Sequence, residues 1–256
     1  MTPSDQEALG RVLDRVADDL LWEAAVDRPP VNAFRVAQRL GLRVVRNARI
    51  EERGRFVRHG HAWAGSVIVG AEARPERRHW AVAHEIGEAF AHRVHDSAGD
   101  EFDPAEPGVR EQLANALAGR LLAPRRWLEG VYRDLGGDLI ETKRVFATAS
   151  HELIARRLLE TLGQGLIVTV FDHYCVSWRR GGGYDRPPAL LPAERLAQRR
   201  AHRTGRVVEI IDDLTVRAWP VHEPGWKREI AICAPRYDVI DAWDQHAASG
   251  GWRHVG

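Results

Sequence analysis

The sequence has too few cysteines for a disulfide framework or a thiolate zinc site, because it contains only Cys175 and Cys233. It also has no apolar run long enough to cross a bilayer, and the longest runs are as short as residues 166–171. The first residues lack the basic start and apolar core of a secretory signal. We therefore expect a cytoplasmic protein with no membrane association, in which both thiols are buried.

An excess of charge of one sign is missing as well. The 37 lysines and arginines are matched by 36 aspartates and glutamates, which leaves a formal net charge of +1. This balance argues against direct nucleic-acid binding as the main function, because such binding depends on many unmatched cations. A chain of 256 residues with 44% hydrophobic and 29% charged residues has the composition of a globular protein with one or two domains.

The chain divides into a helix-rich first part and a strand-rich second part. Helical spacing of apolar residues, with stop signals, predicts helices within residues 2–28, 33–40, 76–94, 109–122, 139–146 and 150–162. Strand-like patterns occur at residues 42–45, 62–69, 166–171, 174–178, 207–211, 215–219 and 229–233, with one further helix at 193–202. Pro75 suits the first position of the helix predicted at 76–94. We expect loops at residues 49–60 and 96–106. We expect an α+β fold, with a domain of residues 1–163 followed by a smaller α+β domain of residues 164–256.

The segment richest in chemistry is His84-Glu85-Ile86-Gly87-Glu88, an HExxE motif one residue away from the HExxH motif of zinc hydrolases. The chain has three His-Glu pairs, and only this pair is followed three positions later by a histidine or glutamate. On a helix, His84 and Glu88 project from one face a turn apart and can bind the same ion. Glu85 is rotated off that face, where it can take a proton from metal-bound water.

A third ligand has to come from another segment. His92 is about 12 Å along the helix from His84, too far to share a tetrahedral zinc with it. Glu111, near the start of the helix predicted at 109–122, could bind the ion or could simply suit the positive end of the helix dipole. Asn115 could support Glu111 through a hydrogen bond or serve in helix packing. His79 and His92 could orient the ligands through hydrogen bonds, or could be packing or surface residues.

Two linked motifs resemble the ImmA/IrrE metallopeptidases. The first motif is Arg77-x-His79-Trp80-x-x-Ala83-His84-Glu85-Ile86-Gly87 with His92 beyond it, and the second is Glu111-x-x-Ala114-Asn115-x-x-Ala118 ending in Leu121-Leu122-x-Pro124. The resemblance covers about residues 33–163. It implies a zincin-like domain with Glu111 as the third ligand. It also implies that the protein partner and substrate is a helix-turn-helix transcriptional repressor, cut to release stress or mobile-element genes.

Glu88 departs from the family pattern, which usually has a histidine at this position. Two glutamates and one histidine bring a divalent ion to a net charge of zero, which favours Mn²⁺ over Zn²⁺ more than the usual ligand set does. The expected cofactor is zinc, with manganese as the alternative. The rival hypothesis is a decayed, metal-free site on a non-enzymatic regulator that binds a repressor or a small ligand through its C-terminal domain.

Overall fold

The computed structural model describes residues 3–47, 54–58, 65–98, 107–163, 165–182, 187–211 and 214–235. These residues form helices and two separate β-sheets, which confirms the expected α+β fold class. The contacts divide the chain into one unit of Met1–Val131 with Glu141–Arg157 and a second unit of Tyr132–Ile140 with Leu158–Gly256. The domain boundary near residue 164 stays a prediction.

A small mixed sheet belongs to the first unit. The strand β3 (Gly65–Val69) lies at its centre, parallel to β1 (Arg43–Arg46) and antiparallel to β2 (Gly54–Arg58). Four of the five residues of β3 are buried, as expected of an apolar strand with a neighbour on each side. The sheet therefore offers two edges, β1 and β2, of which β2 is important for the site described below.

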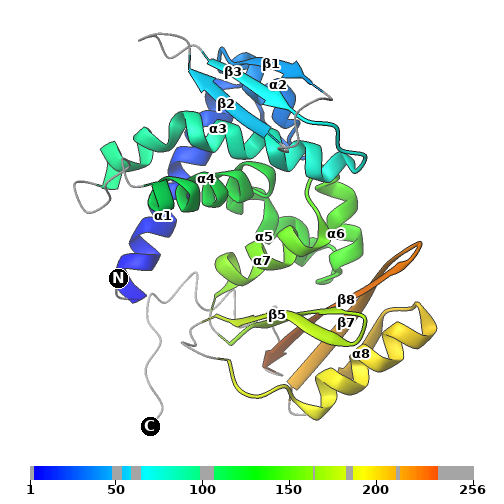
Figure 1. Cartoon of the computed structure of the whole chain (residues 1–256). Helices are drawn as coiled ribbons and strands as arrows, with labels where there is room; N and C mark the ends of the chain where they lie inside the picture. The colour runs from blue at the N-terminus through cyan, green and yellow to red at the C-terminus, as the bar shows by residue number, and fades with distance from the viewer. Residues whose placement is uncertain are drawn as a thin grey trace. The chain divides into compact units, whose positions relative to one another are not determined.

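The long helix α3 (Pro75–Ala98) packs against β2, β3 and the neighbouring helices (Figure 1). It begins at the proline that the sequence placed at a helix start, where a missing N–H leaves no hydrogen bond unmade. The helix α4 (Pro107–Leu122) makes extensive contact with α3, while α1 (Pro3–Glu23) packs on both. The other helices that precede the second sheet along the chain are α2 (Ala33–Arg39), α5 (Arg125–Asp134), α6 (Leu139–Val145) and α7 (His151–Leu162).

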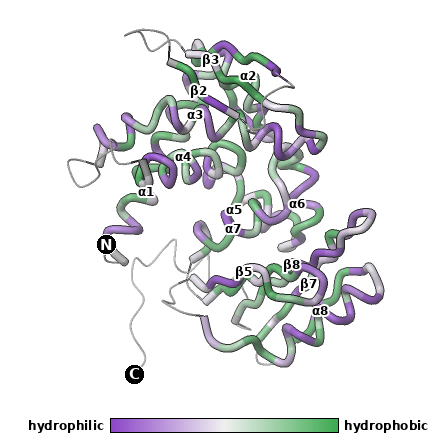
Figure 2. The backbone as a smooth tube through the Cα atoms, viewed as in Figure 1, coloured by the Kyte–Doolittle hydropathy of each residue, from purple (hydrophilic) through white to green (hydrophobic). Residues whose placement is uncertain are grey.

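The second unit contains a five-stranded antiparallel sheet in the order β5-β4-β8-β7-β6. Its strands are β4 (Ile167–Asp172), β5 (Cys175–Gly181), β6 (Val208–Ile211), β7 (Leu214–Glu223) and β8 (Trp226–Pro235). The helix α8 (Pro192–Thr204) packs on β6, β7 and β8. Figure 2 shows hydrophobic and hydrophilic stretches alternating along α8, the pattern of a helix with one face on a sheet. Ala197 and Ala201 join the core on that face.

Three sequence-based expectations need correction, and one helix was missed. Residues 54–58 were expected to be part of a loop but form the strand β2. Their charged sequence does not indicate a strand, and it is the antiparallel pairing with β3 that makes these residues extended. The helix α5 was not predicted, although Leu128 and Tyr132 are buried one turn apart on its inner face. The helix α3 extends four residues past the predicted end, into the expected loop. Cys175 is exposed, whereas Cys233 is buried as expected.

Two expectations lie partly outside the described residues. They are the loop expected at 96–106, from residue 99 onward, and the strand expected at 62–69, in its first residues 62–64. None of the helices that the structure describes combines the length and the low polarity needed to cross a membrane.

Candidate metal centre

The structure brings the three predicted ligands together. His84 and Glu88 lie on α3 and Glu111 lies on α4, and each offers a ligand atom within 4.8 Å of the others. His84 Nε2 is 3.5 Å from Glu111 Oε2. The side chains of His84 and Glu88 are 17% and 18% exposed, whereas that of Glu111 is 59% exposed. The cluster is therefore anchored on α3 and open to solvent at Glu111, as a site that admits a substrate must be.

The distance between α3 and α4 depends on a glycine. A Cβ atom on Gly87 would lie 2.6 Å from the carbonyl oxygen of Ala114 and 2.8 Å from its Cα atom. A side chain at position 87 would thus collide with the backbone of the facing helix. Because Gly87 is one residue before Glu88 and Ala114 is one residue before Asn115, this close approach is what places the α4 side chains beside His84.

Asn115 fixes the orientation and the tautomer of His84. Its Nδ2 atom donates to Glu111 Oε1 at 3.0 Å, and since a carboxylate only accepts, this bond turns the amide oxygen toward α3. The amide oxygen lies 3.1 Å from His84 Nδ1. His84 Nδ1 therefore donates a proton to this oxygen, which in the neutral ring leaves the lone pair on Nε2, facing Glu111. This is the tautomer that a metal ligand requires, so these residues fit a divalent ion.

Glu85 occupies a different position from the three ligands. It is only 6% exposed, on the side of α3 that faces β2. A Cβ atom on Gly54 would lie 2.8 Å from Glu85 Oε1, so the glycine in β2 leaves the space that this carboxylate fills. The carboxylate thus lies between the helix that carries His84 and an edge strand of the small sheet.

Arg110 is a site residue that the sequence analysis missed. Its guanidinium lies 2.5 Å from Glu88 Oε2, which forms an ion pair between α4 and α3. Spacing gave no signal for this pair, because it joins residues of two helices and depends on the contact at Gly87. With Arg110 included, a divalent ion and two glutamates have a net charge of +1 rather than zero.

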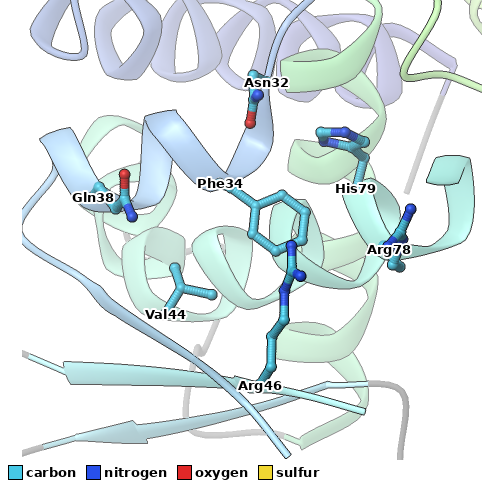
Figure 3. A pocket seen from close by; sticks show the side chains of 7 residues that line it. All are labelled: Asn32, Phe34, Gln38, Val44, Arg46, Arg78 and His79. Atoms are coloured by element: carbon cyan, nitrogen blue, oxygen red, sulfur yellow. The ribbon is translucent and has the colours of Figure 1, made fainter. Parts of the chain in front are cut away.

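His79 and His92 lie in other surroundings. Figure 3 shows His79 lining a cavity of about 450 Å³ whose walls include none of the three candidate ligands; the lining residues are Asn32, Phe34, Gln38, Val44, Arg46, Arg78 and His79. Burial and the nearby charge of Arg78 lower the pKa of His79. The His92 ring lies 6.2 Å from that of Phe90. Support of the ligands by these two histidines stays a prediction.

Comparisons with known proteins give two findings. Residues 37–159 match the family model of the IrrE N-terminal-like domain, Peptidase_M78. A Mycobacterium tuberculosis transcriptional regulator has a similar structure, with a TM-score of 0.65 and 18% sequence identity over 91% of this chain and 81% of that chain, which shows a shared fold. A search among curated proteins finds no match. The matched residues 37–159 include all four residues of the predicted site, so this part of the chain is similar to the IrrE N-terminal-like domain, as its motifs indicate.

Proposed function

We propose that this protein is a metal-dependent endopeptidase whose ion is held by His84, Glu88 and Glu111. The observation that carries the proposal is the convergence of one imidazole nitrogen and two carboxylates within 4.8 Å, beside a buried glutamate. The match to a peptidase family over the same residues supports it. Zinc is the proposed ion, with manganese as the alternative, because the ligand set contains one nitrogen and two carboxylate oxygens.

The ion, when bound, would polarise the scissile carbonyl and acidify a water molecule. Glu85 would act as the general base that takes a proton from the attacking water and passes it to the departing amine. Its place off the ligand face separates this role from that of the three ligands. Asn115 holds His84 in the tautomer that presents Nε2, and it holds Glu111 through the second hydrogen bond.

The proposed substrate is a cytoplasmic helix-turn-helix transcriptional repressor. The family resemblance supports this choice, and the similar fold of a protein named as a transcriptional regulator is consistent with it. Among the described strands, β2 pairs only with β3, so its other edge can accept an extended peptide by backbone hydrogen bonds. A peptide bound there would pass next to Glu85, because Gly54 of β2 adjoins that side chain.

A metal-free regulator on the same scaffold is the second candidate, and one observation favours it. Arg110 already satisfies the charge of Glu88 at 2.5 Å, so this carboxylate has a partner even without an ion. In this alternative the chain would bind a repressor and not cleave it. Direct nucleic-acid binding is not part of either proposal.

The test compares the wild-type chain with Glu85→Gln on a repressor encoded beside its gene. Glutamine has nearly the same shape as glutamate but cannot accept the proton, so we expect cleavage to fall by about 10²-fold or more while metal binding persists. Glu141→Gln, at a half-exposed position on α6, serves as the matched control and should cleave like the wild type. Mass spectrometry of the fragments measures the outcome. Unchanged cleavage by Glu85→Gln would refute the mechanism, and repressor binding without cleavage by any of the three proteins would favour the regulator.

A further inference from the structure

A second group of metal-ligand atoms lies in the second unit, apart from the HExxE motif. His202 on α8, His222 on β7 and Glu229 on β8 offer ligand atoms within 4.8 Å of one another. Glu229 Oε1 is 2.9 Å from His202 Nδ1 and 2.7 Å from His222 Nε2. The three residues come from three different elements, so no local spacing in the sequence marks them.

The charge of Glu229 needs a cation. The Glu229 side chain is fully buried, and its partners among the described residues are His202, His222 and the amide of Gln198. A buried carboxylate is stable only when its charge is compensated. The nearby Glu194, also fully buried on α8, shows the usual solution, because Arg179 pairs with it at 2.5 Å. Glu229 has two imidazoles where Glu194 has a guanidinium.

The surroundings of the three residues are those of a metal site. Gln198 Nε2 donates to Glu229 Oε2 at 2.9 Å and so holds the carboxylate with its other oxygen toward both imidazoles. The ring of Tyr174 stacks on His202 with ring centres 3.7 Å apart. The His222 side chain is 22% exposed, which leaves a path for an ion and a place for water. A tetrahedral ion with ~2.0–2.1 Å bonds separates its ligands by about 3.3 Å, so the two contacts of Glu229 Oε1 with the imidazole nitrogens need to lengthen by only about 0.4 Å and 0.6 Å.

We propose that His202, His222 and Glu229 bind a divalent transition-metal ion that fastens α8 to β7 and β8. The donor set of two imidazole nitrogens and one carboxylate oxygen selects Zn²⁺, Co²⁺ or Ni²⁺ over Mg²⁺ or Ca²⁺. To bind the ion, each ring carries its proton on the nitrogen that faces away from Glu229. This site is independent of the proposed peptidase activity, since none of its residues belongs to the domain matched at 37–159.

The experiment uses the full chain with His84→Ala, which disables the first cluster. After equilibrium dialysis against Zn²⁺ alone, we expect one bound equivalent by elemental analysis. Adding His222→Gln should weaken binding at least tenfold, because an amide replaces an imidazole ligand. Adding His173→Gln, at an exposed histidine in the turn between β4 and β5, is the matched control and should leave binding unchanged. Absence of bound zinc in the His84→Ala chain, or equal affinity in all three chains, would overturn the proposal.

A second measurement does not depend on the folding of a variant. In the wild-type chain, Zn²⁺ should slow modification of His222 by diethyl pyrocarbonate at least fivefold, measured on the His222 peptide by mass spectrometry, whereas Mg²⁺ should have no effect. His173 should be modified at the same rate with and without Zn²⁺. If zinc leaves the modification rate of His222 unchanged, the three residues form a hydrogen-bond network and no metal site.

Discussion

Arg110 determines the charge that an ion would meet at the first cluster. From the HExxE motif and Glu111 we counted two glutamates and one histidine, which bring a divalent ion to a net charge of zero. The sequence does not show which cation lies beside Glu88 in the folded chain. The structure adds one positive charge at 2.5 Å from Glu88. Replacing Glu88 with histidine, the residue usual in the family that the motifs resemble, would therefore leave the Arg110 guanidinium without this carboxylate partner beside a divalent ion.

Replacing Arg110 tests this electrostatic role. Arg110→Gln removes a cation that repels the ion and competes for Glu88, so the affinity for the metal should rise by about three- to tenfold. We expect a value near the lower end of this range, because the Arg110 side chain is 40% exposed and solvent screens its charge. A competition titration against a chromophoric chelator measures this. Arg125→Gln, which breaks a surface pair with Glu129 on α5, is the control and should leave affinity unchanged. Weaker binding in Arg110→Gln would mean that Arg110 supports the ligands more than it repels the ion.

The ligand residues illustrate how far sequence reasoning reaches at this scale. His84 and Glu88 follow from one helical turn of spacing, and Glu111 becomes a strong candidate only through the family resemblance. The interaction of Asn115 with both His84 and Glu111 was only half foreseen, because a hydrogen bond between two helices depends on their packing. His202, His222 and Glu229 were missed for the same reason.

Among the elements, the pair α3 and α4 builds the first cluster through one close contact. Gly87→Ala would normally stabilise a helix interior by up to about 1 kcal/mol, but here the new methyl group meets the Ala114 backbone. We expect destabilisation by about 1–3 kcal/mol and weaker metal binding, because the helices must separate. Gly130→Ala on α5 is the matched control: its Cβ meets nothing within 4 Å, so it should be neutral or stabilising. Urea unfolding of both variants measures the change in the free energy of unfolding. A Gly87→Ala chain that is more stable than the wild type would contradict this explanation.

The start of α7 gives a pH-dependent element. Burial, reinforced by the charge of Lys143 and opposed by that of Glu76, lowers the pKa of His151 from 6.5 to about 4. Above pH 6.5 His151 is neutral in both the folded and the unfolded chain, so it does not change the free energy of unfolding with pH. Between pH 6.5 and 4 only the unfolded chain takes up a proton at His151. The free energy of unfolding should therefore decrease by up to about 3 kcal/mol as the pH is lowered from 6.5 to 4. The decrease caused by His151 should level off below pH 4.

Urea unfolding between pH 4 and 7 checks this prediction on the wild-type chain and on His151→Gln. The variant has no group that titrates at position 151, so its stability should fall less steeply than that of the wild type. Parallel curves for the two proteins would show that another group causes the loss.

The elements themselves were predictable where their apolar pattern was long and regular. The helix α3 was expected from Pro75 and a long stretch without breakers, and all five strands of the second sheet were expected from short apolar runs between turn residues. The strand β2 was missed because Gly54-Arg55-Phe56-Val57-Arg58 contains few apolar residues. Its order comes from pairing with β3, an interaction that a local pattern does not contain.

At the scale of the whole molecule, the described residues of each of the two units contain one candidate metal cluster. The first combines one imidazole with two carboxylates and is open at Glu111, as hydrolysis of a large substrate requires. The second combines two imidazoles with one buried carboxylate. These differences agree with the proposed catalytic task of the first cluster and the proposed stabilising task of the second.

Metal content measured with the second cluster disabled tests the central claim most directly. In a full chain carrying His222→Gln, dialysed against Zn²⁺ or Mn²⁺, elemental analysis should find one bound equivalent. Adding Glu111→Gln should reduce the bound metal at least tenfold, because a carboxylate ligand is lost, whereas adding Glu141→Gln should not. Stoichiometric metal that depends on Glu111 is the result that this account predicts. A chain that binds neither ion, or that retains its metal after Glu111→Gln, would contradict it.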